Sequence, residues 1–401
     1  MGQSTFPVPS SGSSTSTVLP VNASSVILDG SLTSASTYTT TVNGNGGIAY
    51  LTATDNPATI TVSGTAYSVP ANTVVASKAF GASTSVTVAN GGFVGTPATF
   101  TASTMSSASS WTAVTYGNGY FVAVQYSGTT AGAYSTNGTT WTASTMPSAD
   151  NWYSVIYGNG KFVAVAYGTT VGAYSTNGTT WTASTMPSAD NWFGIAYGLV
   201  GANPYFVAVA NNSTTAGAYS INGTSWTAST MPSASAWYGV TYGNGYFVAV
   251  AQNTTAGAYS TNGTTWTAST MPSSSNWSRV TYGNGYYVAV ALNTTSGAYS
   301  TNGTTWTGST MPSGVAWRAV IYGGGYYVAV AQNTTAGAYS SNGITWTAST
   351  MPSSSAWYGV TFGNGYFVAI QSSSTTAGAY FAQSAALPVN FGIYNGPTTI
   401  N

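Results

Sequence analysis

The chain has 401 residues, of which four are basic and four acidic, so its formal net charge is zero. Binding to nucleic acid or to anionic membranes depends on clustered Lys and Arg, and this composition excludes both. Histidine and cysteine are absent, so disulfides and zinc or thiol chemistry are excluded, and no cofactor or metal is expected.

The chain begins with a segment rich in Ser, Thr and Pro, residues 1–20, which predicts an extended arm. It has neither a basic segment nor an apolar run, so we expect no secretory signal. Residues 21–95 carry short runs of Val, Ile and Thr, separated by turn signals such as Asn43-Gly44. These runs predict a small antiparallel β-sandwich, a separate domain suited to attachment.

A repeat of about 40 residues fills the next region, 96–381, and each copy carries two tryptophans. The first series is Trp111, Trp152, Trp192, Trp237, Trp277, Trp317 and Trp357. The second series is Trp141, Trp181, Trp226, Trp266, Trp306 and Trp346. A fixed period of this length indicates one supersecondary unit copied into a closed or stacked array.

Each copy divides into four short strands, which we number from the second copy. The first strand covers residues 152–157, and Asn159-Gly160 after it predicts a type I′ hairpin turn. The second strand, 161–166, is apolar on both faces, and two further strands follow at 171–175 and 180–184. Four antiparallel strands in a unit of this length are typical of a β-propeller blade.

The strand count predicts a closed ring. The first three strands occur seven times, but a fourth strand with its tryptophan follows only six of them. The missing strand is found upstream at 99–104, where Phe100 takes the tryptophan position, and we expect it to pair near 377–380. This pairing would leave no free edge, and the capping repeats of an open solenoid are not visible. The prediction is a seven-bladed propeller, followed by a tail at 382–401.

The turn between the third and fourth strands reads Tyr-Ser-Thr-Asn-Gly-Thr-Thr-Trp, as at residues 134–141 and 259–266. It resembles the Asp-box repeat of sialidase-like propellers, in the shortened form common in bacteriophage virion proteins, although Asn replaces Asp and the loop is one residue shorter than the sialidase form. The resemblance covers residues 99–380 and implies that this turn is a folding element whose Trp belongs to the core. It does not imply sialidase activity, because glutamate is absent and only two arginines, Arg279 and Arg318, are available in the repeat.

Two carboxylates in the repeat are the candidates for acid–base chemistry. Asp150 and Asp190 precede the first strand in consecutive copies, so they should lie on one face in adjacent blades. A pair of this kind is the minimum for glycoside hydrolysis. Other copies carry Ser, Asn or Ala there, so we expect a turn-forming role and predict no enzymatic activity and no calcium site.

The repeat varies most just after the first tryptophan, where the copies carry seven partly different residues. We predict a ligand face from this position and the next one, made of Tyr153, Phe193, Tyr238, Arg279, Arg318 and Tyr358. Aromatic rings stack on sugar faces and guanidinium groups donate hydrogen bonds, so a glycan is the expected ligand. The alternative is drift at tolerant surface positions.

These observations favour a non-enzymatic virion structural protein of a bacteriophage, such as a fibre, spike or decoration protein. The N-terminal domain or the C-terminal tail would bind other virion proteins, and the propeller would face host-surface glycans from the virion surface. A bacterial surface adhesin or lectin is the alternative, and a glycan-cleaving enzyme is a third class that lacks the expected catalytic groups.

Overall fold

The computed structural model describes residues 96–212, 214–372 and 375–383, together with the backbone of nine strands between residues 4 and 89. By its contacts the chain divides into two units. One contains residues 96–382, and the other contains residues 1–95 with 383–401. Residues 384–401 of the predicted tail lie outside the described residues.

The N-terminal strands form two sheets. The first has the order β1-β3-β5-β8 and the second the order β2-β4-β9-β6-β7. Their bounds are β1 Ser4–Pro7, β2 Thr17–Leu19, β3 Val26–Ser31, β4 Tyr38–Val42, β5 Ile48–Thr52, β6 Ala58–Val62, β7 Thr65–Val69, β8 Val74–Lys78 and β9 Thr84–Ala89. The pairs β1–β3, β3–β5 and β2–β4 are parallel, so these sheets are not purely antiparallel as we expected.

The difference has a physical reason, since β1 and β2 lie inside the segment for which composition predicted an extended arm. Strands that are distant in sequence can pair in parallel, whereas alternation along one strand carries no information about the direction of its partner. The side chains of this region lie outside the described residues, so the sandwich remains a prediction.

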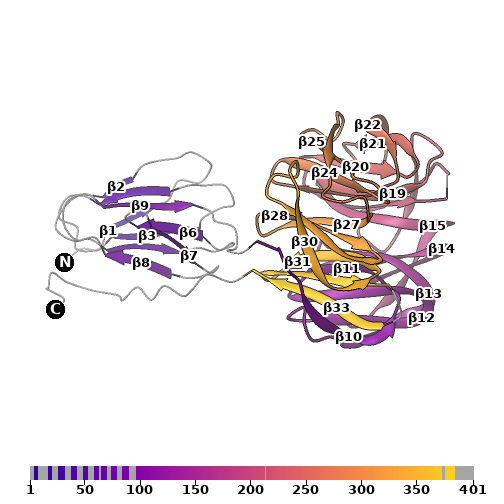
Figure 1. Cartoon of the computed structure of the whole chain (residues 1–401), viewed down its shortest axis with the longest axis horizontal. Helices are drawn as coiled ribbons and strands as arrows, with labels where there is room; N and C mark the ends of the chain where they lie inside the picture. Colours follow the sequence, from indigo (N-terminus) through magenta and orange to yellow (C-terminus); the bar gives the residue numbers. More distant parts are fainter. Residues whose placement is uncertain are drawn as a thin grey trace. The chain divides into compact units, whose positions relative to one another are not determined.

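Residues 96–382 form a ring of seven four-stranded antiparallel blades (Figure 1). In the first three blades some strands run on from one blade into the next, so that they join as one sheet of the order β11 to β18. These strands are β11 Trp111–Gly117, β12 Tyr120–Ser135, β13 Thr142–Gly158, β14 Lys161–Ser175, β15 Thr182–Val200, β16 Asn203–Ala210, β17 Ala216–Ser220 and β18 Thr227–Thr230.

The other blades are separate sheets. The fourth contains β19 Trp237–Gly243, β20 Tyr246–Ala251, β21 Thr254–Ser260 and β22 Thr267–Ser275. The fifth contains β23 Trp277–Gly283, β24 Tyr286–Ala291, β25 Ser296–Ser300 and β26 Thr307–Thr310. The sixth contains β27 Ala316–Gly323, β28 Tyr326–Gln332, β29 Thr334–Ser340 and β30 Thr347–Ser355. The seventh contains β31 Trp357–Gly363, β32 Tyr366–Gln371, β33 Thr375–Ala382 and β10 Thr101–Ser109.

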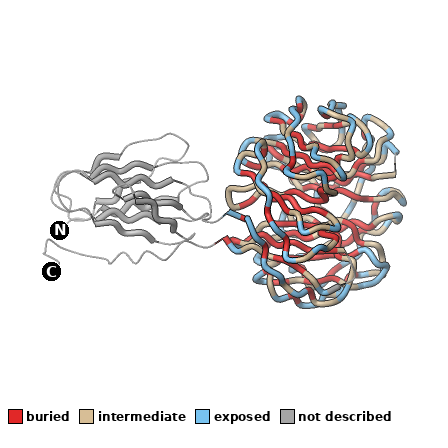
Figure 2. The backbone as a smooth tube through the Cα atoms, in the orientation of Figure 1, coloured by how far each residue is buried: buried red, intermediate tan, exposed pale blue. Residues whose placement is uncertain are grey.

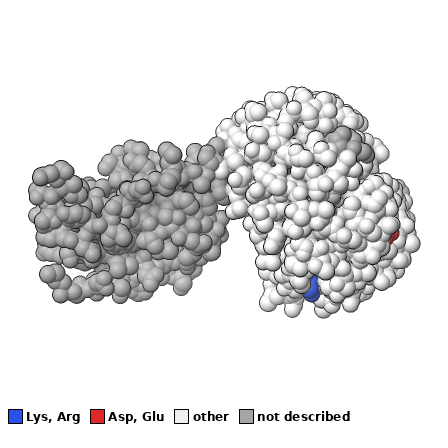
Figure 3. All heavy atoms as spheres, turned by 90° about the horizontal axis from the view of Figure 1, so that it is seen from below, with Lys and Arg blue, Asp and Glu red and all other residues white. Residues whose placement is uncertain are grey.

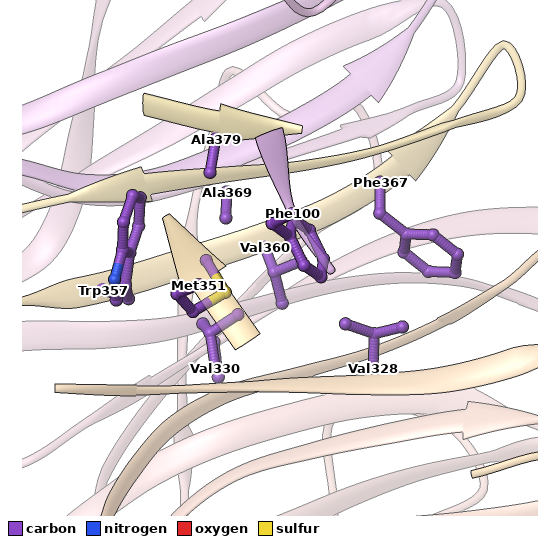
Figure 4. Close-up of a cluster of buried hydrophobic side chains, with 10 residues drawn as sticks. Phe100, Val328, Val330, Met351, Trp357, Val360, Phe367, Ala369 and Ala379 are labelled. Atoms are coloured by element: carbon purple, nitrogen blue, oxygen red, sulfur yellow. The ribbon is translucent and has the colours of Figure 1, made fainter. Parts of the chain in front are cut away.

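The seventh blade confirms the predicted closure of the ring. Its outer strand β10 comes from the start of the region and pairs antiparallel with β33, with Thr101 opposite Tyr380 and Thr104 opposite Ala377. Phe100 is buried beside Met351, Trp357 and Phe367, in the place that the second tryptophan takes in other blades (Figure 4). The ring therefore closes with β-sheet hydrogen bonds between its two ends.

Seven single β-bridges link the outer strands of neighbouring blades around this ring. Each joins two threonines or a threonine and a serine, at Thr99–Thr350, Thr104–Thr140, Thr145–Thr180, Thr185–Ser225, Thr230–Thr265, Thr270–Thr305 and Thr310–Thr345. The repeat of the same bridge in every blade shows that the copies are equivalent in three dimensions.

The hairpin turns between the first and second strands have the predicted conformation. Asn159 and Gly160 both have positive φ, 46° and 73°, as a type I′ turn requires. The second strands that follow are buried on both faces, which Figure 2 shows as red segments inside the ring. Phe162, Val163 and Ala164, for example, are fully buried.

The turn between the third and fourth strands is held by its serine and asparagine. The backbone N–H of Gly138 donates to Ser135 Oγ at 2.9 Å, and the N–H groups of Thr139 and Thr140 donate to Asn137 Oδ1 at 3.0 and 2.9 Å. All six copies of the motif make these bonds. The prediction that Asn can still form this side-chain turn is confirmed.

The repeated tryptophans belong to the core, as predicted. All seven of the first series are fully buried, and each indole N–H donates to the carbonyl of a serine four residues earlier, as Trp237 does to Ser233 at 3.2 Å. In the second series Trp141, Trp181 and Trp306 are buried and the others partly so. The first series is therefore not available to a ligand.

Candidate functional site

The first strands of the blades surround the axis of the propeller. Each contacts the first strand of the next blade, and the contact of β31 with β11 completes the circle. In each blade the pairing register shifts between the tryptophan and the second residue after it, so side chains from both positions that follow the tryptophan can reach the axis.

Three of the predicted ligand-face residues form an aromatic stack across neighbouring blades. The ring centroids of Tyr153 and Phe193 are 3.7 Å apart, and those of Phe193 and Tyr238 are 3.9 Å apart. The rings are tilted by 33° and 43°. We call Tyr153, Phe193, Tyr238, Arg279, Arg318 and Tyr358 the axial cluster.

The two arginines of the axial cluster reach this stack from the fifth and sixth blades. Arg318 Nη2 donates to Tyr153 Oη at 2.6 Å, although the two residues come from the sixth and second blades. The Arg318 guanidinium also lies 4.2 Å from the ring centroid of Tyr358. Arg279 lies 5.3 Å from the ring centroid of Phe193 and donates through Nη1 to the carbonyl of Tyr238 at 3.1 Å.

The structure therefore brings all six predicted residues together. These side chains are more buried than residues at tolerant surface positions would be. Tyr153, Phe193 and Arg318 are 5%, 2% and 8% exposed. Tyr238, Arg279 and Tyr358 are partly exposed. The sequence could not indicate this burial, since it depends on how far side chains reach across a ring of seven strands.

Burial also shifts the ionisation of the cluster. It raises the pKa of Tyr153 well above its usual value, and the positive charges of Arg318 and Arg279 oppose that shift without cancelling it. Burial lowers the pKa of Arg279, and Arg318 adds to the lowering, whereas Tyr153 opposes it.

A cavity of about 120 Å³ lies beside the cluster on the axis. Its lining includes Thr112, Ser154, Arg279, Ala319 and Tyr358, which come from five different blades. At about 30 Å³ for one water molecule, this volume suits a small group of a ligand rather than a whole one.

The first and fifth blades carry small residues at the same position, and these have a structural role. Thr112 Oγ1 donates to the carbonyl of Trp152 at 2.8 Å, and Ser278 Oγ donates to the carbonyl of Trp317 at 2.7 Å. Each hydroxyl links its own blade to the first strand of the next. Of the two, Thr112 also lines the cavity on the axis.

Two tyrosines extend the site beyond the prediction. Tyr126 and Tyr167 follow the second strands of the first and second blades, and their ring centroids lie 6.0 and 6.1 Å from that of Tyr153. Tyr126 is 37% exposed. The signal for them is in the sequence, since both stand in the loops after the second strands, where the copies differ, but nothing there indicates contact with Tyr153.

The two candidate catalytic carboxylates stand at equivalent register positions, opposite Thr129 and Thr169. Both lie inside long strands, β13 and β15, rather than in the turns we expected, because these strands run on from blade to blade. Asp190 accepts hydrogen bonds from Ser188 and, at 2.6 Å, from Asn212 Nδ2. This local bonding occupies both oxygens of Asp190.

Charged groups are rare elsewhere on the described part, and Figure 3 shows one face that is almost entirely uncharged. Among the described residues no group of three His, Cys, Asp or Glu side chains could hold a metal ion. Within the same residues no helix is long and apolar enough to span a bilayer.

Comparison with known proteins identifies the fold. A streptogramin B lyase structure superposes with a TM-score of 0.62 at 13% identity, covering 71% of this chain and 98% of the lyase. Virginiamycin B lyase from Staphylococcus aureus gives the same score and identity, with 70% and 98% covered. YCF48 bound to D1 peptide gives 0.56 at 14% identity, with 73% and 98% covered. The chain thus has the fold of these seven-bladed propellers.

No protein-family model matches the sequence, and no curated protein does either. At the identities found, the structural similarity shows the fold alone. One structural neighbour is a lyase and another is bound to a peptide, so proteins with this architecture do not share one activity.

Proposed function

We propose that this protein is a non-enzymatic binding protein whose propeller uses the axial cluster to hold a host-surface glycan. The observation that carries the proposal is the convergence of four aromatic rings and two guanidinium groups on the axis, from six blades of a nearly uncharged molecule. Aromatic faces stack on the apolar faces of sugar rings, and guanidinium groups donate hydrogen bonds to their oxygens.

The wider context of this proposal is a bacteriophage virion. The Ser/Asn turn that resembles the Asp-box of phage virion proteins and the uncharged surface support a fibre, spike or decoration protein. In this proposal the N-terminal domain or the C-terminal tail binds other virion proteins, and the protein lies on the virion surface. Many copies of the propeller on one virion would bind glycans through avidity, even where each single contact is weak.

An enzymatic role has less support. Neither Asp150 nor Asp190 lines the axial cavity, and Asp190 is hydrogen-bonded to Ser188 and Asn212. A variant of virginiamycin B lyase with a histidine replaced by alanine is described as catalytically inactive. This chain contains no histidine at all, so a lyase reaction that uses one cannot be carried over to it.

A glycan array with the full-length protein tests the binding function. The Tyr238→Ala variant should lose the signal, because it removes a partly exposed ring at the end of the stack. Tyr259→Ala is the matched control, since it removes a tyrosine that pairs with Tyr246 in the same blade, outside the axial cluster. An equal signal from Tyr238→Ala and the native protein would refute the proposed site, and release of a cleaved product would refute the non-enzymatic assignment.

The virion context needs a separate test. Imaging intact particles with a label on the C-terminus should place the protein on the virion surface, and the genes beside its own should encode other virion proteins. Genes for export or cell-wall attachment in that position would favour the bacterial adhesin instead.

A further inference from the structure

The axial cluster contains two cations and no carboxylate. The Arg279 and Arg318 guanidinium groups lie 5.3 and 5.9 Å from the centroid of the same ring, that of Phe193. Burial lowers the pKa of Arg279, and no carboxylate contributes to that shift. Bringing two like charges into a desolvated site is unfavourable unless an opposite charge joins them.

The hydrogen-bond donors of these arginines are also under-used. Arg318 is 8% exposed and makes one hydrogen bond, to Tyr153, while its Nε is buried without a partner. Arg279 makes two, both from Nη1 and both to backbone carbonyls. A guanidinium has more N–H donors than these bonds satisfy, and a buried donor without a partner is costly.

The cavity beside Arg279 has the size and lining for the missing acceptor. Its volume is about 120 Å³, and Arg279 is its one charged lining residue. Thr112 and Ser154 add hydroxyl groups to the lining, and the Tyr358 ring connects it with Arg318. A small oxyanion in this place would face a cation on one side and hydroxyl groups on the others.

We infer that the axial cavity is a binding site for an oxyanion, a carboxylate or sulfate group, held by Arg279 with Arg318 behind Tyr358. Carboxylates and tetrahedral oxyanions alike accept paired hydrogen bonds from guanidinium groups, and such charge-assisted bonds are stronger than neutral ones. The inference rests on the proposed function where the oxyanion belongs to a glycan, because it then names an acidic saccharide as the ligand. A free inorganic anion would use the same chemistry.

Calorimetric titration of the full-length protein with sodium sulfate, at an ionic strength held constant with sodium chloride, tests the site. We expect saturable binding of one sulfate per chain, and acetate should compete with it. With so few other charges, the protein offers little nonspecific background for an anion effect. A titration without saturation would overturn the inference, and this result needs no variant that has to fold.

Matched variants locate the anion. Arg279→Gln should weaken sulfate binding about tenfold or more, the loss expected for a charge-assisted hydrogen bond, and Arg318→Gln should weaken it less, because Arg318 lies behind the Tyr358 ring and contributes only its charge. Lys161→Gln removes the same charge at a distant place, where Lys161 Nζ donates to the carbonyl of Asn222 at 3.0 Å, and should bind like the native protein. Equal binding by Arg279→Gln and the native protein would overturn the assignment.

Two oligosaccharides of equal size, one neutral and one carboxylated, separate this inference from the proposed function. Binding of the carboxylated sugar alone, with competition by sulfate, supports both. Sulfate binding without binding of either sugar supports the anion site and contradicts the glycan function. Binding of the neutral sugar that sulfate does not displace supports the glycan function and contradicts the anion site.

Discussion

Two adjacent positions of the same strand have opposite roles in this propeller. Trp237 stands at a position that is identical in all seven blades, and its side chain is fully buried between blades. Tyr238, the next residue, stands at a position that differs between blades, and its ring joins the axial cluster. The comparison teaches that the repeated residues build the ring, whereas divergent residues beside them meet in the axial cluster.

The largest expected effect is a difference in stability between variants at these two positions. Trp237→Ala removes a large, fully buried side chain and should lower the free energy of unfolding by about 3–5 kcal/mol. Tyr238→Ala should cost less stability, because that ring is partly exposed, but should abolish ligand binding. Urea denaturation followed by tryptophan fluorescence measures the first effect. Equal stability losses for the two variants would contradict the different roles assigned to the two positions.

A second test concerns the contact that closes the ring. A Cβ added to Gly363, in the seventh blade, would lie 2.0 Å from Cγ of Tyr116 in the first blade. Gly363→Ala should therefore push these blades apart and lower the free energy of unfolding by about 1–3 kcal/mol. Gly308→Ala is the control, since nothing lies within 4 Å of its added Cβ. If both variants melt at the native temperature, the two ends are not packed as described.

A smaller effect should come from the hydroxyl that links the stack to Arg318. Tyr153→Phe keeps the ring but removes the oxygen that accepts a hydrogen bond from Arg318 Nη2. It should lower the free energy of unfolding by about 1–3 kcal/mol, because a buried donor then has no acceptor. Tyr238→Phe keeps the same kind of ring in the same stack and should change stability by less than about 0.5 kcal/mol. In thermal denaturation Tyr153→Phe should melt at a lower temperature than Tyr238→Phe. The reverse order would contradict the role assigned to the Tyr153 hydroxyl.

The smallest expected effect is that of pH on the stability of the protein near neutrality. With no histidine in the chain, stability should be nearly constant from about pH 5 to 9. Burial raises the pKa of Tyr153, Tyr287 and Tyr327 above that of an unfolded tyrosine, about 10. The unfolded chain then loses protons first, so stability is full below about pH 10 and falls as the pH rises beyond it.

Urea midpoints measured at intervals across that range check this prediction. Tyr153→Phe should make the alkaline fall less steep, because one buried phenol is removed. A stability that rises above about pH 10, or that breaks near pH 6.5 where histidine would titrate, would contradict the account.

The sequence predicted the ring well because the repeat carries its information locally. Asn159-Gly160 defines a hairpin and Asn137 a turn, and the seven-fold count of strands places Phe100 in the last blade. The axial site was predicted as a set of divergent positions on one face. Its contacts could not be predicted, because Arg318 and Tyr153 are 165 residues apart and meet only across the closed ring.

The sequence also did not predict that expected strands of the first blades run on into one another. Residues 120–135 contain two strands of one blade, yet the structure has them as a single strand, β12. Its pairing with β13 continues past the expected loop, to Thr129 opposite Asp150 and Tyr126 opposite Asn151. Local turn signals do not reveal such pairing, since it depends on the strand that arrives from the next blade.

One measurement tests the central claim, that binding resides where the copies differ. Replacing Arg279 by Gly and Arg318 by Thr gives the fifth and sixth blades residues that other blades carry there, as in Gly239 and Thr112. Sulfate titration of this double variant is compared with that of the native protein. The account predicts a folded propeller with native urea resistance, within about 1–2 kcal/mol, that no longer binds sulfate. A folded double variant that binds sulfate as tightly as the native protein would contradict it.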